Sequence, residues 1–214
     1  MDTFKNRDGK PVLLAMVKAV QDNKVYLGEI DGLIGDGDHG MNMNKGFTVF
    51  EERYGKKEIG FTGGLRELGM VLLNEIGGSM GPIYGTVFME MAEAGDGFEE
   101  IGLAQFSQML EASLEGLSDI VEARVGDKTL IDTLSPAVYT LKAEAKTKGD
   151  FTDALDKMKG AAKAGRDSTR DMAAKFGRSS RLGERSRGVL DAGAVSCCVI
   201  LEAMADGIKE VLKI

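Results

Sequence analysis

The sequence has few of the residues that redox, zinc and membrane-spanning functions require. Cys197 and Cys198 are its only cysteines and are adjacent, and His39 is its only histidine. A zinc site made of imidazoles and thiolates cannot be assembled from this set. No apolar run reaches about 18 residues, so we expect no transmembrane segment. Residues 1–8 are too polar for a signal peptide, and the cysteines lie in an apolar segment typical of a core, which predicts a reduced, cytoplasmic protein.

Positive charge is also scarce overall, with 27 Lys and Arg against 34 Asp and Glu and a net charge of −7. This balance argues against a general binder of nucleic acid or anionic membranes. Residues 159–187 are the exception, because nine basic and three acidic residues give them a local charge of +6. One face of a helix there would carry Lys159, Lys163, Arg166 and Arg170. This face is either solvated or a contact for a phosphate or an acidic partner.

Strand signals are absent as well. Alternating apolar and polar runs rich in Val, Ile, Thr and aromatic residues do not occur, so we expect no sheet. Apolar residues recur with helical spacing instead, and each of the three prolines, Pro11, Pro82 and Pro136, stands close to the start of such a segment. The predicted helices cover about residues 11–28, 40–54, 64–76, 82–94, 103–118, 129–147, 151–176 and 192–212. With no linker or shift in composition, residues 1–214 are predicted to form one all-α domain, a bundle of eight helices.

Glycine, in contrast, is abundant. The 29 glycines cluster in residues 28–46, 60–69, 77–85, 95–102 and 177–193. Because glycine is unfavourable in helix interiors, these clusters indicate functional connections.

The first glycine cluster contains three carboxylates, Asp31, Asp36 and Asp38, within eight residues. Carboxylates this close repel one another unless a cation lies between them, and Mg²⁺ takes oxygen ligands of this kind. An EF-hand is excluded, because Met41 and Phe47 stand where its loop needs glycine and glutamate. A turn cluster with Asx-type hydrogen bonds is the alternative, but it needs fewer glycines. We therefore predict a metal site.

His39 directly follows this acidic loop. A lone histidine is usually structural, but beside three metal ligands we interpret it as a hydrogen-bond donor to a phosphate oxygen. No G-x-S-x-G elbow supports a Ser/His/Asp triad.

A second glycine-rich loop, residues 75–86, runs into a helix that can start at Pro82. Free N–H groups and the positive end of the helix dipole make such a start an anion site, and phosphate is the expected anion. The loop is neither a P-loop, since no G-K-[ST] follows, nor a dinucleotide motif, since no strand precedes it. Close helix packing through small residues is the alternative explanation.

Two further stretches complete the set. G-D-K-T-L at 126–130 opens a predicted helix, and residues 177–194 are basic and glycine-rich. Acidic metal loops, phosphate-cradling glycines and arginines recur together in phosphoryl transfer.

These four motifs resemble, in order, those of the nucleotide-binding L subunit of dihydroxyacetone kinases. They are G-D-G-D-H-G at 35–40, G-G-S-M-G at 77–81, G-D-K-T at 126–129, and L-G-E-R-S followed by D-A-G-A within 182–194. The resemblance covers most of the chain. It implies an antiparallel eight-helix barrel that holds ADP or ATP at one end through two Mg²⁺ ions. It also implies that a separate K subunit holds the sugar through its own histidine, so that no sugar-binding group is expected on this chain.

The resemblance also assigns site residues. It makes Asp31, Asp36 and Asp38 the Mg²⁺ ligands. The nucleotide contacts it implies are His39, Gly40, Met41, Asn42, Ser79, Met80, Thr129, Leu130, Arg178, Asp191, Ala192 and Gly193. Two positions depart from the usual pattern: Met80 replaces a small hydroxyl residue and Ala192 replaces a proline. The usual histidine is also replaced within 188–190, so a different substrate or donor is expected to be compatible with this site.

Two phosphoryl donors fit the resemblance. Either ATP is consumed and exchanged, or ADP stays bound as a coenzyme and is rephosphorylated by a phosphohistidine protein of the sugar phosphotransferase system. L-type chains of this length favour the second. The acceptor is dihydroxyacetone or another short ketose such as erythrulose. We expect a K-type subunit and a phosphohistidine carrier as partners, and a homodimer or hetero-oligomer. A nucleotide-loaded adaptor that transfers no phosphate is the alternative function.

Overall fold

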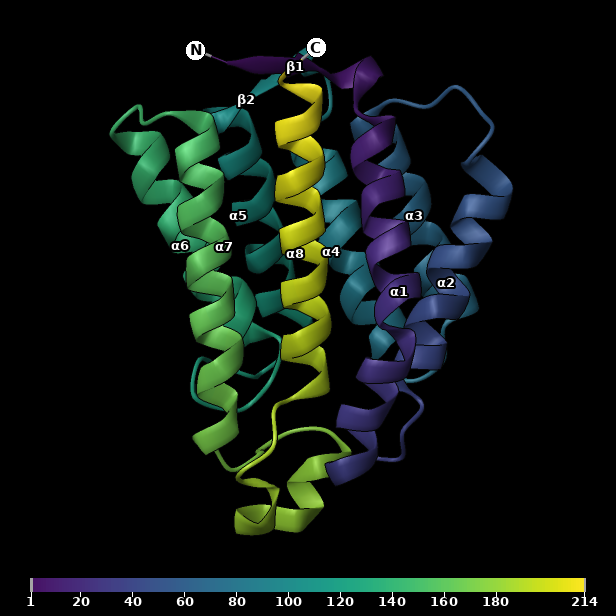
Figure 1. The fold of residues 1–214 in the computed structure, drawn as a ribbon, viewed down its shortest axis with the longest axis vertical. Coiled ribbons are helices and arrows are strands. Elements are labelled where there is room, and N and C mark those ends of the chain that lie inside the picture. Colours follow the sequence, from purple (N-terminus) through teal and green to yellow (C-terminus); the bar gives the residue numbers. More distant parts are fainter. Residues whose placement is uncertain (1, 214) are drawn as a thin grey trace.

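The computed structural model describes residues 2–213, in which eight α-helices run up and down (Figure 1). They are α1 (Lys10–Ile34), α2 (His39–Tyr54), α3 (Phe61–Glu75), α4 (Met80–Ala94), α5 (Leu103–Ile120), α6 (Ile131–Lys146), α7 (Phe151–Ser168) and α8 (Ala192–Val211). The predicted antiparallel eight-helix bundle is confirmed. None of the helices in this part of the chain combines the length and hydropathy needed to cross a membrane.

The helices pack in chain order and close into a ring. Each helix contacts the next one along the chain, and α8 returns to pack against α1. The inside of the ring is filled with apolar side chains, including the fully buried Phe47, Phe50, Phe61, Phe88 and Phe106. Phe47 and Phe88 meet edge to face with ring centroids 6.1 Å apart, an arrangement that the ring quadrupoles favour.

The structure corrects the prediction that no strand occurs. β1 (Thr3–Lys5) pairs antiparallel with β2 (Glu100–Gly102), at the end of the barrel where the chain begins (Figure 1). Segments of three residues are too short to show the alternation from which a strand is recognised in a sequence.

Two helix boundaries also differ from the prediction. α1 continues to Ile34 because Leu27, Ile30 and Ile34 extend its buried face. α7 ends at Ser168 instead of about 176, and short 3₁₀ segments follow at Thr169–Asp171 and Arg178–Ser186.

Pro136 is the sixth residue of α6 and not close to its start. Proline has no N–H, so the Asp132 carbonyl one turn earlier receives no helical hydrogen bond from it. Gly165 of α7 packs against this carbonyl, since a Cβ at residue 165 would lie only 2.0 Å from the Asp132 oxygen. This close contact between α6 and α7 thus depends on a glycine.

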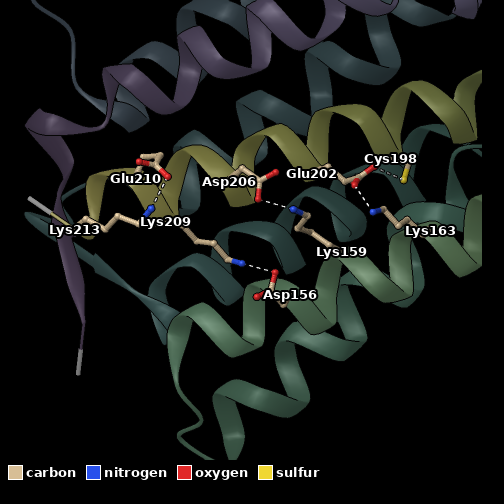
Figure 2. Close-up of polar contacts among 9 residues, drawn as sticks. All are labelled: Asp156, Lys159, Lys163, Cys198, Glu202, Asp206, Lys209, Glu210 and Lys213. Atoms are coloured by element: carbon tan, nitrogen blue, oxygen red, sulfur yellow. Dashed lines mark hydrogen bonds and ion pairs between the residues drawn. The ribbon is translucent and has the colours of Figure 1, made fainter.

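The basic side chains of the predicted face contact other groups of the same chain. Lys159 and Lys163 of α7 pair with Asp206 and Glu202 of α8, at 2.5 and 2.7 Å (Figure 2). Lys209 of α8 pairs in the opposite direction with a carboxylate of α7. Arg166 pairs with its neighbour Asp167, and Arg170 donates to the Gly188 carbonyl. The acidic partner of this face is therefore largely α8 of the same chain.

Candidate functional site

The four glycine-rich motifs lie at one end of the barrel because of its topology. In an up-and-down ring, α2, α4, α6 and α8 all begin at the same end, where α1 finishes (Figure 1). The motifs at 35–40, 77–81, 126–130 and 182–194 lie in the connections before these four helices and in the first turns of α2, α4 and α8. Helix starts carry unpaired N–H groups and positive dipole ends, so this end of the barrel favours anions.

The three predicted metal ligands converge. Asp31 lies in the last turn of α1, Asp36 and Asp38 lie in the loop that follows, and one carboxylate oxygen from each lies within 4.8 Å of the other two. The loop turns at Gly37, whose φ of +77° favours glycine. At Gly40 a Cβ would lie 1.9 Å from the Lys24 carbonyl, so glycine lets α2 pack directly on α1. Carboxylate oxygens around a common point are the kind of ligand that Mg²⁺ prefers.

Arg178 is distant from this acidic loop in the sequence but contacts it in the structure. It opens the 3₁₀ segment before α8, and its guanidinium forms an ion pair with Asp36. The Arg178 side chain is exposed, so it is accessible to a ligand bound at the loop.

His39 is buried, with 7% of its surface exposed. Its backbone N–H lies 3.4 Å from Asp31 Oδ2, and its Nε2 lies 2.8 Å from the hydroxyl of Ser196 in α8. Burial lowers the pKa of His39 to about 4, although the nearby Asp31 carboxylate raises it. The imidazole is therefore neutral at pH 7, and one of its nitrogens is committed to the protein interior.

Ser196 and Tyr84 are site residues that the sequence reasoning missed. Tyr84 of α4 places its hydroxyl 2.6 Å from Ser196 Oγ and 3.2 Å from the Gly193 carbonyl. Ser196 is fully buried, and it is the single hydroxyl in the apolar run 194–201. A polar residue isolated in a buried helix face is a sequence signal for an internal hydrogen bond. Through these contacts α2, α4 and α8 meet.

The second glycine loop is open to solvent. A Cβ at Gly77 or Gly78 would meet no atom within 4 Å, and Gly78 has a φ of +69°. Ser79 is exposed, whereas Met80, the first residue of α4, is half-buried and packs on the core. The helix thus starts two residues before Pro82 and presents its first N–H groups beside an uncovered loop.

The G-D-K-T segment is organised by a buried carboxylate. Asp132 accepts hydrogen bonds from the backbone N–H groups of Gly126 and Thr129, at 2.6 and 2.8 Å. Thr129 is half-buried, and Leu130 is buried in the main core. A Cβ at Gly193 would lie 3.6 Å from the Leu130 nitrogen, so this segment adjoins the start of α8.

Lys128 was also missed as a candidate. Its ammonium group is buried and donates to the carbonyls of Thr169 and Val189, and burial lowers its pKa. These two acceptors lie at the two ends of the segment that carries Arg178. Lys128 therefore ties that segment to the barrel.

The remaining predicted residues surround the starts of α2 and α8. Asp191 caps α8 by accepting from the Ala194 N–H at 2.8 Å, and Ala192 behind it is buried. Met41 is exposed and Asn42 is half-buried in the first turn of α2. Contacts thus connect the motifs at 35–40, 126–130 and 182–194, whereas the loop at 77–81 is linked to them through Tyr84 of the helix that follows it. The exposed Met41 side chain has a surface position only.

The sequence profile of the DAK2 domain matches residues 33–206. The chain belongs to the DAK2 domain family. This DAK2 domain is 38% identical over 186 residues to a protein of Listeria innocua named PEP-dependent dihydroxyacetone kinase 1, ADP-binding subunit DhaL, covering 86% of this chain and 88% of the relative. It is 37% identical over 188 residues to the corresponding subunit of Escherichia coli K12, covering 86% of this chain and 89% of that one.

A solved structure shares the fold of this DAK2 domain. The dihydroxyacetone kinase of C. freundii in complex with AMP-PNP and Mg²⁺ superposes with a TM-score of 0.72 and 21% identity, over 92% of this chain and 33% of that one. The fold therefore recurs as one part of a longer chain.

Proposed function

We propose that this DAK2 domain is the ADP-binding subunit of a phosphotransferase that phosphorylates dihydroxyacetone or a similar short ketose. The observation that carries the proposal is the convergence of Asp31, Asp36 and Asp38 at the end of the barrel where four helices begin. The 38% identity to an ADP-binding subunit over most of both chains supports the same function.

The chain's own residues would act by binding and orienting. Asp31, Asp36 and Asp38 would hold Mg²⁺, two ions in our proposal, and N–H groups at the starts of α2 and α4 would bind phosphate oxygens. Bound Mg²⁺ would neutralise the charge of the nucleotide phosphates and of the phosphoryl group in transfer. Arg178 would add a guanidinium over the phosphates. The nucleotide contacts would be His39, Gly40, Met41, Asn42, Ser79, Met80, Thr129, Leu130, Arg178, Asp191, Ala192 and Gly193.

The acceptor ketose would be held by a K-type sugar-binding subunit, in a hetero-oligomer or between paired copies, in the cytoplasm. We propose that ADP remains bound as a coenzyme and is recharged by a phosphohistidine carrier protein. The Listeria and E. coli relatives, whose names state dependence on PEP, support this donor over free ATP.

The first test measures retention of ADP. Protein loaded with Mg²⁺ and ADP is passed through a desalting column, and the nucleotide that co-elutes is quantified. We expect the wild type to retain ADP and Asp38→Ala to lose it, with an unchanged helical circular dichroism spectrum. Asp22→Ala is the matched control, since Asp22 is an exposed carboxylate on the same helix α1 and pairs with the neighbouring Lys18. If Asp38→Ala retains ADP as the wild type does, the assignment of Asp38 as a Mg²⁺ ligand is wrong.

The second test measures transfer. The chain is mixed with a K-type subunit, dihydroxyacetone or erythrulose, and either ATP or a PEP-driven phosphocarrier. Sugar phosphate formed with the phosphocarrier supports the proposal, whereas product formed with ATP alone, together with ADP that exchanges within seconds, identifies an ATP-dependent kinase subunit. No product with either donor identifies a nucleotide-loaded adaptor.

A further inference from the structure

The buried contact of His39, Ser196 and Tyr84 joins three helices just behind the acidic loop. His39 Nε2 is 2.8 Å from Ser196 Oγ, which is 2.6 Å from the Tyr84 hydroxyl. Both hydroxyls also lie 3.2 Å from the Gly193 carbonyl. The side chains come from the first turn of α2, the first turns of α4 and the first turns of α8. A rigid junction here would hold three of the four motif loops in register.

Proton counting limits how this junction can be connected. Each hydroxyl has one proton to donate, and a neutral imidazole donates from one nitrogen and accepts at the other. If both short contacts are used in sequence, Tyr84 donates to Ser196 and Ser196 donates to His39 Nε2. The His39 proton then lies on Nδ1. In the reverse arrangement His39 donates from Nε2, and one hydroxyl proton must go to the Gly193 carbonyl at 3.2 Å. That carbonyl lies in the first turn of α8, where one lone pair accepts a helical hydrogen bond, so the proton would go to the second lone pair over a contact longer than the other two.

The other ring nitrogen, Nδ1, has some contact with solvent. No buried side-chain nitrogen or oxygen within residues 2–213 lacks a hydrogen-bond partner. Nδ1 of His39 makes no hydrogen bond to these residues, so it reaches solvent, and it does so at the start of α2 beside the acidic loop. A proton on Nδ1 attracts a phosphate oxygen, whereas a lone pair there repels one.

We propose that Tyr84 and Ser196 are positioning residues that hold the His39 proton on Nδ1, so that the imidazole donates a hydrogen bond to a phosphate oxygen of the bound nucleotide. The second half of this statement rests on the proposed function, and the first half does not. The directed chain from Tyr84 through Ser196 also fixes the plane of the ring, because Nε2 is anchored in the interior.

The experiment reads the tautomer directly. His39 is the single histidine, so protein labelled with ¹⁵N-histidine gives one pair of ring nitrogen signals, and long-range ¹⁵N–¹H correlations at pH 7.5 without nucleotide show which nitrogen carries the proton. We expect Nδ1 to be protonated in the wild type and a mixed or Nε2-protonated ring in Ser196→Ala. A wild-type proton on Nε2, or an unchanged Ser196→Ala spectrum, would overturn the proposal.

A matched control separates this role from packing. Ser113 of α5 is also fully buried and donates to a carbonyl three residues back, Leu110, but it lies outside the junction. Ser113→Ala should leave the His39 spectrum unchanged. Tyr84→Phe keeps the Ser196 hydroxyl but removes the group that donates to it. This variant should show a partial mixture of the two His39 tautomers, and it provides the test if Ser196→Ala does not fold. An unchanged His39 spectrum in Tyr84→Phe would show that Tyr84 does not help to set the tautomer.

Nucleotide affinity tests the second half independently. By titration calorimetry with Mg²⁺ and ADP, Ser196→Ala should bind about tenfold more weakly and Ser113→Ala within about twofold of the wild type. If the wild type itself does not bind ADP, the proposed function fails while the tautomer result stands. If Ser196→Ala changes the tautomer but not the affinity, the phosphate contact of His39 is overturned.

Discussion

Asp191 combines two opposing roles in one side chain. Its carboxylate caps α8, which stabilises the helix start, but burial raises its pKa to about 6 from an ordinary value of 3.8. The native chain thus holds this proton more tightly than the unfolded chain. The free energy of unfolding therefore decreases as pH rises from about 4 to 6, and the penalty persists above pH 6.

Asp191→Asn should remove this penalty and keep the cap, since asparagine caps helices as well as aspartate does. In metal-free buffer at pH 7.5 we expect the variant to be more stable than the wild type by up to about 2 kcal/mol, less than the full equivalent of the pKa change because Asp191 is only partly buried. The gain should vanish near pH 4. Urea unfolding at both pH values measures it.

Asp150 provides the matched control for that measurement. It caps α7 by accepting from Asp153 at 2.9 Å but is exposed. Asp150→Asn should show no pH-dependent gain. A variant Asp191→Asn that is less stable than the wild type at pH 7.5 would mean that Lys128 nearby compensates the buried charge fully.

At the scale of elements, α7 and α8 are joined by ion pairs that run in both directions (Figure 2). Lys159 lies with 17% of its side chain exposed, and Asp206 with 58%. An ion pair with one partly desolvated member lies toward the upper end of the range for surface pairs. These ion pairs between α7 and α8 therefore account for the basic residues of α7 without any bound ligand.

A double-mutant cycle tests the ion pairs between α7 and α8. Combining Lys159→Ala with Asp206→Ala should give a coupling free energy of about 0.5 to 1 kcal/mol in urea unfolding, which 1 M salt reduces. The exposed pair of Lys18 and Asp22 on α1 should couple more weakly. Equal coupling in the two cycles would show that burial of Lys159 adds nothing.

At the scale of the whole molecule, the ring closes where α8 packs on α1. Gly207 lies against the α1 backbone, since a Cβ there would be 3.0 Å from the Val12 Cα. One continuous apolar cluster includes residues from all eight helices. The first and last helices thus contribute to the same hydrophobic core. We therefore propose that residues 1–214 form a single domain.

A single domain should unfold in one step. Because the chain has four tyrosines and no tryptophan, tyrosine fluorescence and far-ultraviolet circular dichroism can follow urea unfolding separately. We expect coincident transitions with one midpoint. Two separated midpoints would show that part of the ring folds independently.

Local information in the sequence determined much of this protein. Helical spacing predicted all eight helices, and Asp31, Asp36 and Asp38 were predicted as a cluster because they are close along the chain. Helix ends were less accurate, as at Ser168, where a buried lysine from another motif holds the following turn. The two short strands carry no sequence pattern and were missed.

Only the tertiary structure decided which distant residues meet. Lys128 with Thr169 and Val189, and His39 with Ser196 and Tyr84, are contacts between residues 41 to 157 positions apart. Such pairs depend on how helices pack around the ring, and no local periodicity encodes them. The sequence by itself therefore determined the helices and the acidic loop, whereas ring closure determined the buried polar contacts that hold the motif loops together.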